Sequence, residues 1–196
     1  MNKELEIRIK NEANPKKAKI LQGFFKTGKG EYGEGDVFLG ITVPIQRKIA
    51  KEFKEIDYKE IQELIESKIH EKRLIGILIL IEKFKNSEEK EKKQIFEFYI
   101  KNSKNVNNWD LVDLSAEHIV GDYLFDKPKD ILYSLAKSEN LWQRRISIVS
   151  TFAFIRKGEL KDTLKIANIL INDKQELIHK AVGWMLREVG KKDEKI

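Results

Sequence analysis

The spacing of apolar residues constrains the fold most strongly. In almost every segment beyond residue 43 they recur at i, i+3 and i+4, which places them on one face of an α-helix. No segment shows the strict alternation that a half-buried strand requires. The chain has three prolines in 196 residues, so few helices are interrupted. The sequence therefore predicts an all-α fold.

The same spacing predicts where the helices lie. They are expected at about 4–11, 15–26, 44–54, 58–67, 70–85, 88–102, 107–121, 128–137, 140–156, 159–171 and 174–190. Thr42 is expected to cap the helix that has Pro44 in its first turn. Asn107 and Asp110 are expected to form a capping-box-like pair at the start of 107–121, which gives Asp110 a structural role.

Shorter and longer helices alternate from residue 58, and the longer ones align with one another at offsets of 37, 35 and 35 residues. The aligned segments are 72–76, 109–113, 144–148 and 179–183. A repeat of this length built from helix pairs is typical of a curved α-solenoid, in which stacked pairs bury a continuous core. At this length one domain covering 1–196 is expected.

In three of the four aligned segments basic residues occupy one or both of the first two positions, near helix N-termini. They are Lys72, Arg73, Arg144, Arg145 and Lys180. Side-chain charge and unpaired backbone N–H groups both favour phosphate there, although such residues can equally be solvated surface charges. At the fifth position the small residues Gly76 and Gly183 could allow a backbone to approach closely, whereas Asp113 in the same register is acidic.

Trp109 and Asp113 lie one turn apart, away from the apolar stripe of their helix. That stripe consists of Leu111, Val112, Ser115 and Ile119. A ring face and a carboxylate both attract positive charge, so the pair could form a site for a cationic or electron-poor ligand. The alternative is an ion pair between Asp113 and a basic neighbour such as Arg145. Glu117, one turn beyond Asp113, is a reserve candidate whose proximity would raise the pKa of one of the two carboxyl groups.

The other two tryptophans differ in their surroundings. Trp142 lies in line with Ile146, Val149 and Ala153, which predicts a position in the core. Trp184 lies off the apolar stripe of the last helix, closer to Lys180, Arg187 and Lys191. It is expected either to pack on a neighbouring repeat or to line a binding groove.

Composition excludes several classes of protein. The net charge of +6 is spread along the chain and points weakly to an anionic partner. Without cysteine the chain forms no disulfide or thiolate metal site, and its three histidines lack metal-ligand spacing, so we expect no metal and no cofactor. The start lacks a signal sequence, and the apolar run 74–81 is too short to span a bilayer, which predicts a soluble cytoplasmic protein.

The glycine-rich segment 23–30 nearly matches a phosphate-binding P-loop. Gly30 stands where the loop requires the Ser or Thr that holds magnesium, and the preceding segment is predicted as helix rather than strand. We therefore exclude nucleotide binding. The glycines between 28 and 35 are expected to form a mobile loop beside a binding groove, where Tyr32 could touch the ligand, or a plain connector.

Several motifs occur together in an order that resembles a known family. They are Phe38-Leu39-Gly40-Ile41-Thr42-Val43-Pro44, Asn108-Trp109-Asp110-Leu111-Val112-Asp113, Trp142-Gln143-Arg144-Arg145-Ile146-Ser147 and Val182-Gly183-Trp184-Met185-Leu186-Arg187-Glu188. Their succession resembles the signatures of the AlkD family of DNA alkylation repair glycosylases, which fold as HEAT-like helical repeats. The resemblance covers nearly the whole chain.

This resemblance implies an enzyme that hydrolyses the N-glycosidic bond of cationic alkylpurines, such as N3-alkyladenine and N7-alkylguanine, in duplex DNA. Asp113 would stabilise the oxocarbenium-like sugar and place water, Trp109 and Trp184 would flank the lesion's deoxyribose, and Arg145 would hold the nearby phosphate. The further DNA-binding candidates are Arg144, Lys180, Arg73, Lys72 and Arg187. The implied protein acts as a monomer without a cofactor.

The chain departs from the family pattern at its end, where members usually continue with a helical segment that caps the solenoid. We therefore expect the last repeat to lack its cap and Trp184 to be more exposed than in longer relatives. Two alternative functions remain open from the sequence. One is a non-catalytic DNA-binding relative, and the other is a helical scaffold that binds a partner protein.

Overall fold

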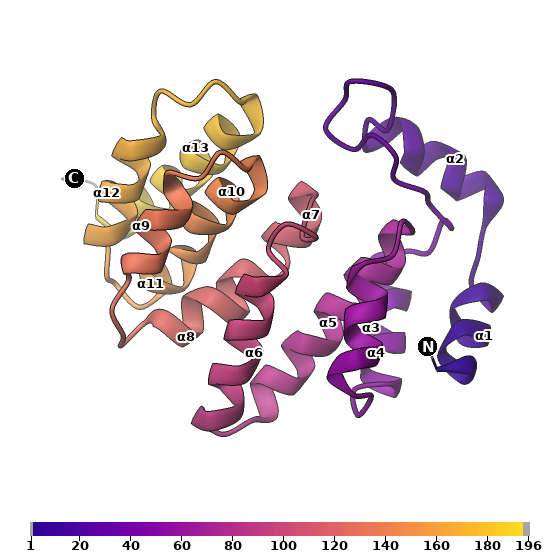
Figure 1. Cartoon of the computed structure of the whole chain (residues 1–196). Helices are drawn as coiled ribbons and strands as arrows, with labels where there is room; N and C mark the ends of the chain where they lie inside the picture. The colour runs from indigo at the N-terminus through magenta and orange to yellow at the C-terminus, as the bar shows by residue number, and fades with distance from the viewer. Residues whose placement is uncertain (1, 194–196) are drawn as a thin grey trace. The chain divides into compact units, whose positions relative to one another are not determined.

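The computed structural model describes residues 2–193, which form helices joined by turns and loops (Figure 1). Among these residues the one β-like feature is an isolated bridge between Val37 and Ile69. The predicted all-α fold is confirmed. No helix in the described part of the chain has the length and apolarity needed to cross a membrane.

The chain divides into two compact units, Met1–Glu91 and Lys92–Ile196. The first holds α1 (Lys3–Asn11), α2 (Pro15–Phe24), α3 (Val43–Glu52), α4 (Tyr58–Ile65) and α5 (His70–Asn86). After α6 (Glu89–Lys101), the second holds α7 (Trp109–Asp113), η1 (Glu117–Gly121), α8 (Asp122–Leu124), α9 (Asp130–Ala136), α10 (Leu141–Ser150), α11 (Phe152–Arg156), α12 (Lys161–Leu170) and α13 (Glu176–Lys192). That the chain is a single domain stays a prediction.

Each predicted helical segment contains a helix, but two long segments are split. The segment 107–121 divides into α7 and the π-helical turn η1, and 140–156 divides into α10 and α11 at Thr151. At both breaks hydroxyl side chains bond back to the preceding turn: Ser115 Oγ to Leu111 O at 2.5 Å and Thr151 Oγ1 to Ile148 O at 2.7 Å. Such bonds compete with the helical ladder and bend a helix.

The predicted cap of α7 was wrong by one residue. Asn108, not Asn107, is the N-cap, and its Oδ1 accepts from Trp109 N at 2.8 Å. Asp110 Oδ1 accepts from the neighbouring Leu111 N at 2.9 Å. Thr42 does precede α3 as its N-cap, with Pro44 in the first turn, but its side chain makes no capping bond. The fixed φ of Pro44 favours the helical start without that bond.

In the first unit α5 is the central helix. It is buried on all sides between Leu74 and Ile81, which explains why this run is apolar all round. Helices α3 and α4 both pack against it. A Cβ at Gly76 would lie 3.0 Å from Leu64 Cβ, so the small residue serves close packing of α4 on α5.

The carboxylate of Glu71, at the start of α5, organises the segment that leads into α3. It accepts hydrogen bonds from the backbone N–H groups of Leu39, Gly40 and Ile41 at 2.7–3.2 Å and is buried. Gly40 has φ +84°, and a Cβ there would lie 2.2 Å from Asn14 O. The Phe38–Pro44 motif is thus fixed in two ways. Gly40 allows the positive φ, and the buried Glu71 carboxylate accepts the hydrogen bonds of the backbone N–H groups.

Replacing Glu71 by Gln should lower the free energy of unfolding by about 2–3 kcal/mol, because bonds to a charged acceptor are lost and an amide donor faces backbone donors. Urea unfolding followed by circular dichroism measures the change. Glu55→Gln is the matched control, since Glu55 is 85% exposed. Equal losses in the two variants would contradict this role of Glu71.

In the second unit α10 is the central helix, and α7, α9, α12 and α13 all pack against it. Helices pair in sequence, α9 with α10 and α12 with α13, as the repeat predicts. Trp142 is buried, which confirms its predicted core position. Gly121 permits close approach of η1 to α10, because a Cβ there would lie 2.2 Å from Ser150 O.

Candidate functional site

Helix α7 presents Trp109 and Asp113 as the sequence predicts. Leu111 and Val112 are fully buried, and so are Ser115 and Ile119 beyond the helix, whereas Trp109 and Asp113 are partly exposed. The two candidate residues therefore lie on the face of α7 turned away from the core.

Asp113 is held by a two-pronged ion pair with Arg145 of α10. Arg145 Nε donates to Asp113 Oδ1 and Nη2 to Oδ2, both at 2.8 Å. The remaining guanidinium nitrogen, Nη1, donates to the backbone carbonyl of Leu177 in the first turn of α13. Arg145 thereby links the carboxylate on α7 to the start of α13. The fork geometry fixes the plane of the carboxylate.

Burial raises the pKa of the Asp113 carboxyl above its ordinary value. The bonds and charge of Arg145 act in the opposite direction, and the nearby charge of Asp110 adds to the increase. The side chain of Asp113 keeps 20% of its surface exposed, against 6% for Arg145. The carboxylate is therefore reachable from solvent while its partner is enclosed.

The reserve candidate Glu117 has a partner of its own. It lies on η1, its side chain is 10% exposed, and it pairs with Arg156. The like charge that acts on Asp113 comes from Asp110 instead. A neighbouring carboxylate does raise the pKa of Asp113, but that neighbour is Asp110 and not Glu117 as the sequence suggested.

Trp184 of α13 is partly exposed and contacts Phe152, with ring centroids 5.6 Å apart. Phe152 begins α11, which packs against α13. Of the two expected positions, the structure shows packing on a neighbouring element, with part of the ring still accessible. Because α7 and α13 both pack on α10, Trp109 and Trp184 belong to helices that share one support.

Most of the basic residues predicted to bind phosphate are engaged within the protein. Lys72 Nζ lies 2.7 Å from Glu6 Oε1, Arg73 Nη2 lies 2.6 Å from Asp36 Oδ2, and Arg144 Nε lies 2.6 Å from Asp173 Oδ2. Lys72 and Arg73 are buried, as is Arg145. These four residues join helices to neighbouring segments, and their DNA contacts stay predictions.

Arg73 and Arg144 make the same kind of contact in the two units. The Nη1 of each donates to the carbonyl six residues earlier, Ser67 and Ser138 respectively, both at 2.8 Å, and another nitrogen bonds an aspartate. By contact Arg73 therefore corresponds to Arg144, one position from the register that aligned Arg73 with Arg145.

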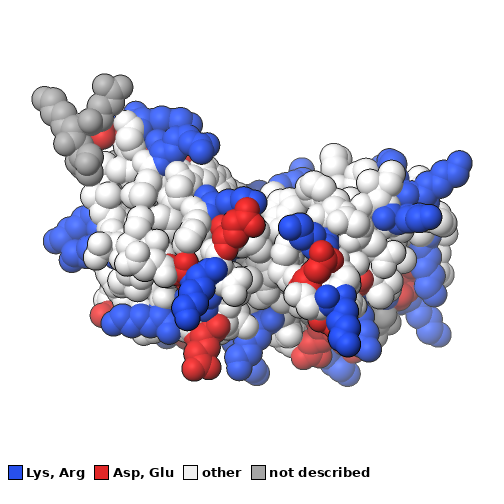
Figure 2. Space-filling model, turned by 90° about the horizontal axis from the view of Figure 1, so that it is seen from above, with Lys and Arg blue, Asp and Glu red and all other residues white. Residues whose placement is uncertain are grey.

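Two predicted DNA-binding residues of α13 are accessible. Lys180 is 63% exposed and pairs with Glu176 one turn earlier, and Arg187 is exposed. Figure 2 shows acidic and basic side chains interleaved over one face of the molecule. The charge visible on that face is mixed, so individual accessible cations matter more than net charge.

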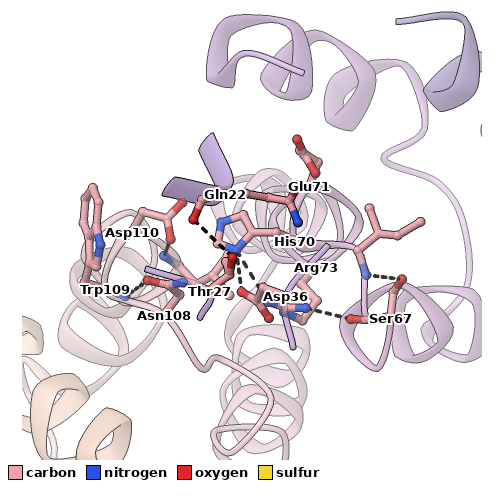
Figure 3. Close-up of polar contacts among 12 residues, drawn as sticks. Gln22, Thr27, Asp36, Ser67, His70, Glu71, Arg73, Asn108, Trp109 and Asp110 are labelled. Atoms are coloured by element: carbon pink, nitrogen blue, oxygen red, sulfur yellow. Dashed lines mark hydrogen bonds and ion pairs between the residues drawn. The ribbon is translucent and has the colours of Figure 1, made fainter. Parts of the chain in front are cut away.

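A second polar cluster, in the first unit, is closed to solvent. Asp36 Oδ2 lies within hydrogen-bond distance of His70 Nδ1, at 3.1 Å, and accepts a hydrogen bond from Arg73 Nη2 at 2.6 Å (Figure 3). All three side chains are buried. His70 also stacks on Phe38, with ring centroids 4.6 Å apart. These two partners hold the pKa of the Asp36 carboxyl below its usual range against the effect of burial. The cluster anchors the loop that follows α2.

A family model described as "DNA alkylation repair enzyme" matches residues 5–196. The chain belongs to the family of DNA alkylation repair enzymes. The resemblance inferred from the motifs is thus confirmed at the level of the family. Membership supports a role in the repair of alkylated DNA.

A solved structure of a "Predicted DNA alkylation repair enzyme from Enterococcus faecalis" is similar to this family member with a TM-score of 0.70. The match covers 94% of this chain and 86% of that one, at 18% sequence identity. At this identity the likeness shows the shared fold. No curated protein matches the sequence.

Several contacts at the candidate site were not evident from sequence. The N-cap Asn108 lies one position from the expected residue. The Leu177 carbonyl and the ring of Phe152 lie far in sequence from Arg145 and Trp184, the residues that they contact. Local patterns report helices and their faces, but they contain no signal for which distant backbone carbonyl an arginine will meet.

Proposed function

We propose that this chain is a DNA glycosylase that hydrolyses the N-glycosidic bond of cationic alkylpurines, N3-alkyladenine and N7-alkylguanine, in duplex DNA. The observation that carries the proposal is the partly exposed Asp113 carboxylate, fixed by the Arg145 fork on the same helix face as Trp109. Membership in the family of DNA alkylation repair enzymes supports alkylated DNA as the substrate.

The reaction breaks the bond between sugar C1′ and the base nitrogen. The bonding electron pair leaves with the base and neutralises its positive charge, while C1′ gains cationic character. A water oxygen then bonds to C1′ and releases one proton to solvent, which leaves an abasic site. Asp113 stabilises the positive sugar in the transition state and orients the water. Because the leaving base already carries a charge, no strong acid is needed to protonate it.

The tryptophans provide the surroundings of this carboxylate. Trp109 lies one turn from Asp113, and the accessible part of Trp184 lies on a second helix packed against α10. Their ring faces attract a cationic sugar, and their apolar surface limits the water beside it. In this proposal they flank the deoxyribose of the lesion.

Arg145 acts on Asp113 rather than on DNA in the arrangement observed. Three of its nitrogens are engaged by Asp113 and the Leu177 carbonyl, so it is a positioning residue for the carboxylate. The exposed residues Lys180 and Arg187 are better placed to meet phosphate. Arg145 as a phosphate ligand stays a prediction.

The raised pKa of Asp113 predicts the acidic limb of the pH profile. The ionised carboxylate is the active form, so activity should fall as the pH is lowered through its pKa, at higher pH than an ordinary aspartate with a pKa of about 3.9 would give. Single-turnover base release, corrected for spontaneous loss, measures this limb. A limb at the ordinary value, or none, would count against Asp113 as the titrating group.

The proposal is tested by incubating the protein with a duplex that holds one N7-methylguanine and then cleaving abasic sites with alkali. Base release well above the spontaneous rate is expected. An unmodified duplex of the same sequence is the control and should give none. Release at the spontaneous rate from the methylated duplex would refute the proposal.

The Asp113–Arg145 pair also favours a second candidate, a DNA-binding relative without activity. Both carboxylate oxygens accept bonds from arginine, as a purely structural ion pair would require. Such a protein would bind the methylated duplex with the salt dependence of phosphate contacts and release no base. The assay above separates the two.

A further inference from the structure

Helix α2 is unusual because none of its residues is buried. Ile20 and Phe24 are 70% and 62% exposed, the largest values among the exposed large apolar side chains of residues 2–193. They lie one turn apart, separated by roughly 40° around the helix axis. Large apolar side chains gathered on one surface indicate a binding site more often than scattered ones do.

This helix is nevertheless held at both ends. At its start Asn14 N donates to Leu39 O at 2.7 Å, and Asn14 Oδ1 caps the helix by accepting from Lys17 N at 3.0 Å. At its end Phe25 is buried, with its ring centroid 5.0 Å from Phe38 and 4.9 Å from His70. Figure 1 shows α2 between α1 and the loop that leads to α3. The exposed pair is therefore presented by a fixed support.

The charge of this segment has one sign. Residues 15–30 contain lysines and no aspartate or glutamate. The lysines are Lys16, Lys17, Lys19, Lys26 and Lys29, and all are exposed. Within residues 2–193 none of them is in an ion pair, in contrast to the engaged cations of α5 and α10. Lys16 and Lys17 lie one turn before Ile20 and flank the face that carries Ile20 and Phe24.

We propose that α2 docks across the minor groove of duplex DNA, with Ile20 and Phe24 inserted between base steps and the lysines on the flanking phosphates. Isoleucine and phenylalanine are among the wedges that minor-groove proteins insert, and a row of two matches a groove about 6 Å wide. Partial unstacking of the bases would weaken the stacking that keeps a damaged nucleotide inside the DNA double helix. The inference rests on the proposed action on duplex DNA.

A lipid surface fits these residues less well. A helix that lies in a membrane interface needs a continuous apolar face with a large hydrophobic area. Here the positions one turn before Ile20 hold lysines, Gly23 adds no side chain, and Leu21 is only partly exposed, so the fully exposed apolar surface of α2 is confined to Ile20 and Phe24. Duplex DNA requires no more than that.

The test uses an undamaged duplex that contains 2-aminopurine, whose fluorescence rises when it unstacks. The wild type should raise the fluorescence on binding, and the double variant Ile20→Ser/Phe24→Ser should bind about tenfold more weakly without the rise. Ile7→Ser is the matched control, because Ile7 is 60% exposed on α1, and it should behave as the wild type. Circular dichroism should show that all variants are folded, since no substituted residue is buried.

The lysines are tested by Lys16→Gln/Lys17→Gln/Lys19→Gln. Because each phosphate contact contributes about 0.9 to the slope of log affinity against log salt, the slope should fall by up to roughly 3. Netropsin, which occupies the minor groove, should compete with the wild type. An unchanged slope, no competition, or no fluorescence rise with the wild type would overturn the proposal. It would also be overturned if Ile20→Ser/Phe24→Ser lost binding to anionic vesicles but kept binding to DNA.

The outcome is separable from that of the proposed function. Unstacking with no base release from N7-methylguanine would retain the docking of α2 and reject the glycosylase. Base release by the wild type without any fluorescence rise would retain the glycosylase and reject the docking.

Discussion

Replacing Asp113 by Asn should lower the single-turnover rate of base release from an N7-methylguanine duplex by roughly 10²–10³-fold, the usual effect of removing one electrostatic contact to a transition state. The amide has nearly the same shape but no charge, so it cannot stabilise the cationic sugar. DNA affinity should change little, because Asp113 repels phosphate rather than binding it. Rate and affinity are measured separately with the same duplex.

Asp126→Asn is the matched control for this substitution, since Asp126 is a 76% exposed aspartate of the same unit. It should release base at the wild-type rate. An Asp113→Asn protein as fast as the wild type would remove the catalytic role from Asp113. A folded variant, checked by circular dichroism, is required because Arg145 loses its charged partner.

Replacing Arg145 by Ala should lower the free energy of unfolding by about 3–5 kcal/mol, because it leaves the Asp113 carboxylate without its partner in a mostly enclosed site. The Leu177 carbonyl loses its donor as well. Urea unfolding followed by circular dichroism measures the loss. Arg187→Ala, which removes an exposed arginine from the same unit, should change stability by less than about 0.5 kcal/mol.

The same variants distinguish the two roles considered for Arg145. If Arg145 holds a DNA phosphate, Arg145→Ala lowers the salt slope of DNA binding by about 0.9. If it only positions Asp113, the slope stays at the wild-type value while base release falls. Arg145→Lys keeps the charge but not the fork, so it should recover part of the stability and little of the activity. Full stability in Arg145→Ala would contradict the structural role.

The helices of this fold could be predicted because each carries its own signal. The apolar stripe through Leu111, Val112 and Ile119 identified the buried face of α7 and η1, and the same periodicity placed Trp142 in the core. The breaks at Ser115 and Thr151 were not predicted. They arise where hydroxyl groups bond to the preceding turn and where Gly121 lets η1 approach Ser150, and apolar spacing does not record either contact.

The candidate site was predicted in part for the same reason. That Trp109 and Asp113 lie outside the core follows from one helix, and the structure agrees. The basic row was predicted from position along several helices, and there the structure differs. Lys72, Arg73 and Arg144 meet Glu6, Asp36 and Asp173, carboxylates that come from distant segments. Their availability for phosphate depends on those partners and not on the repeat.

The sequence by itself determined the all-α fold, the family and the exposed face that carries Trp109 and Asp113, because these follow from periodicity and motifs within single helices. Tertiary structure alone decided that Arg145 joins Asp113 to the first turn of α13, and that α2 displays Ile20 and Phe24 between two anchors. Ion pairs and exposure depend on residues brought together from different helices, and no local pattern specifies that meeting.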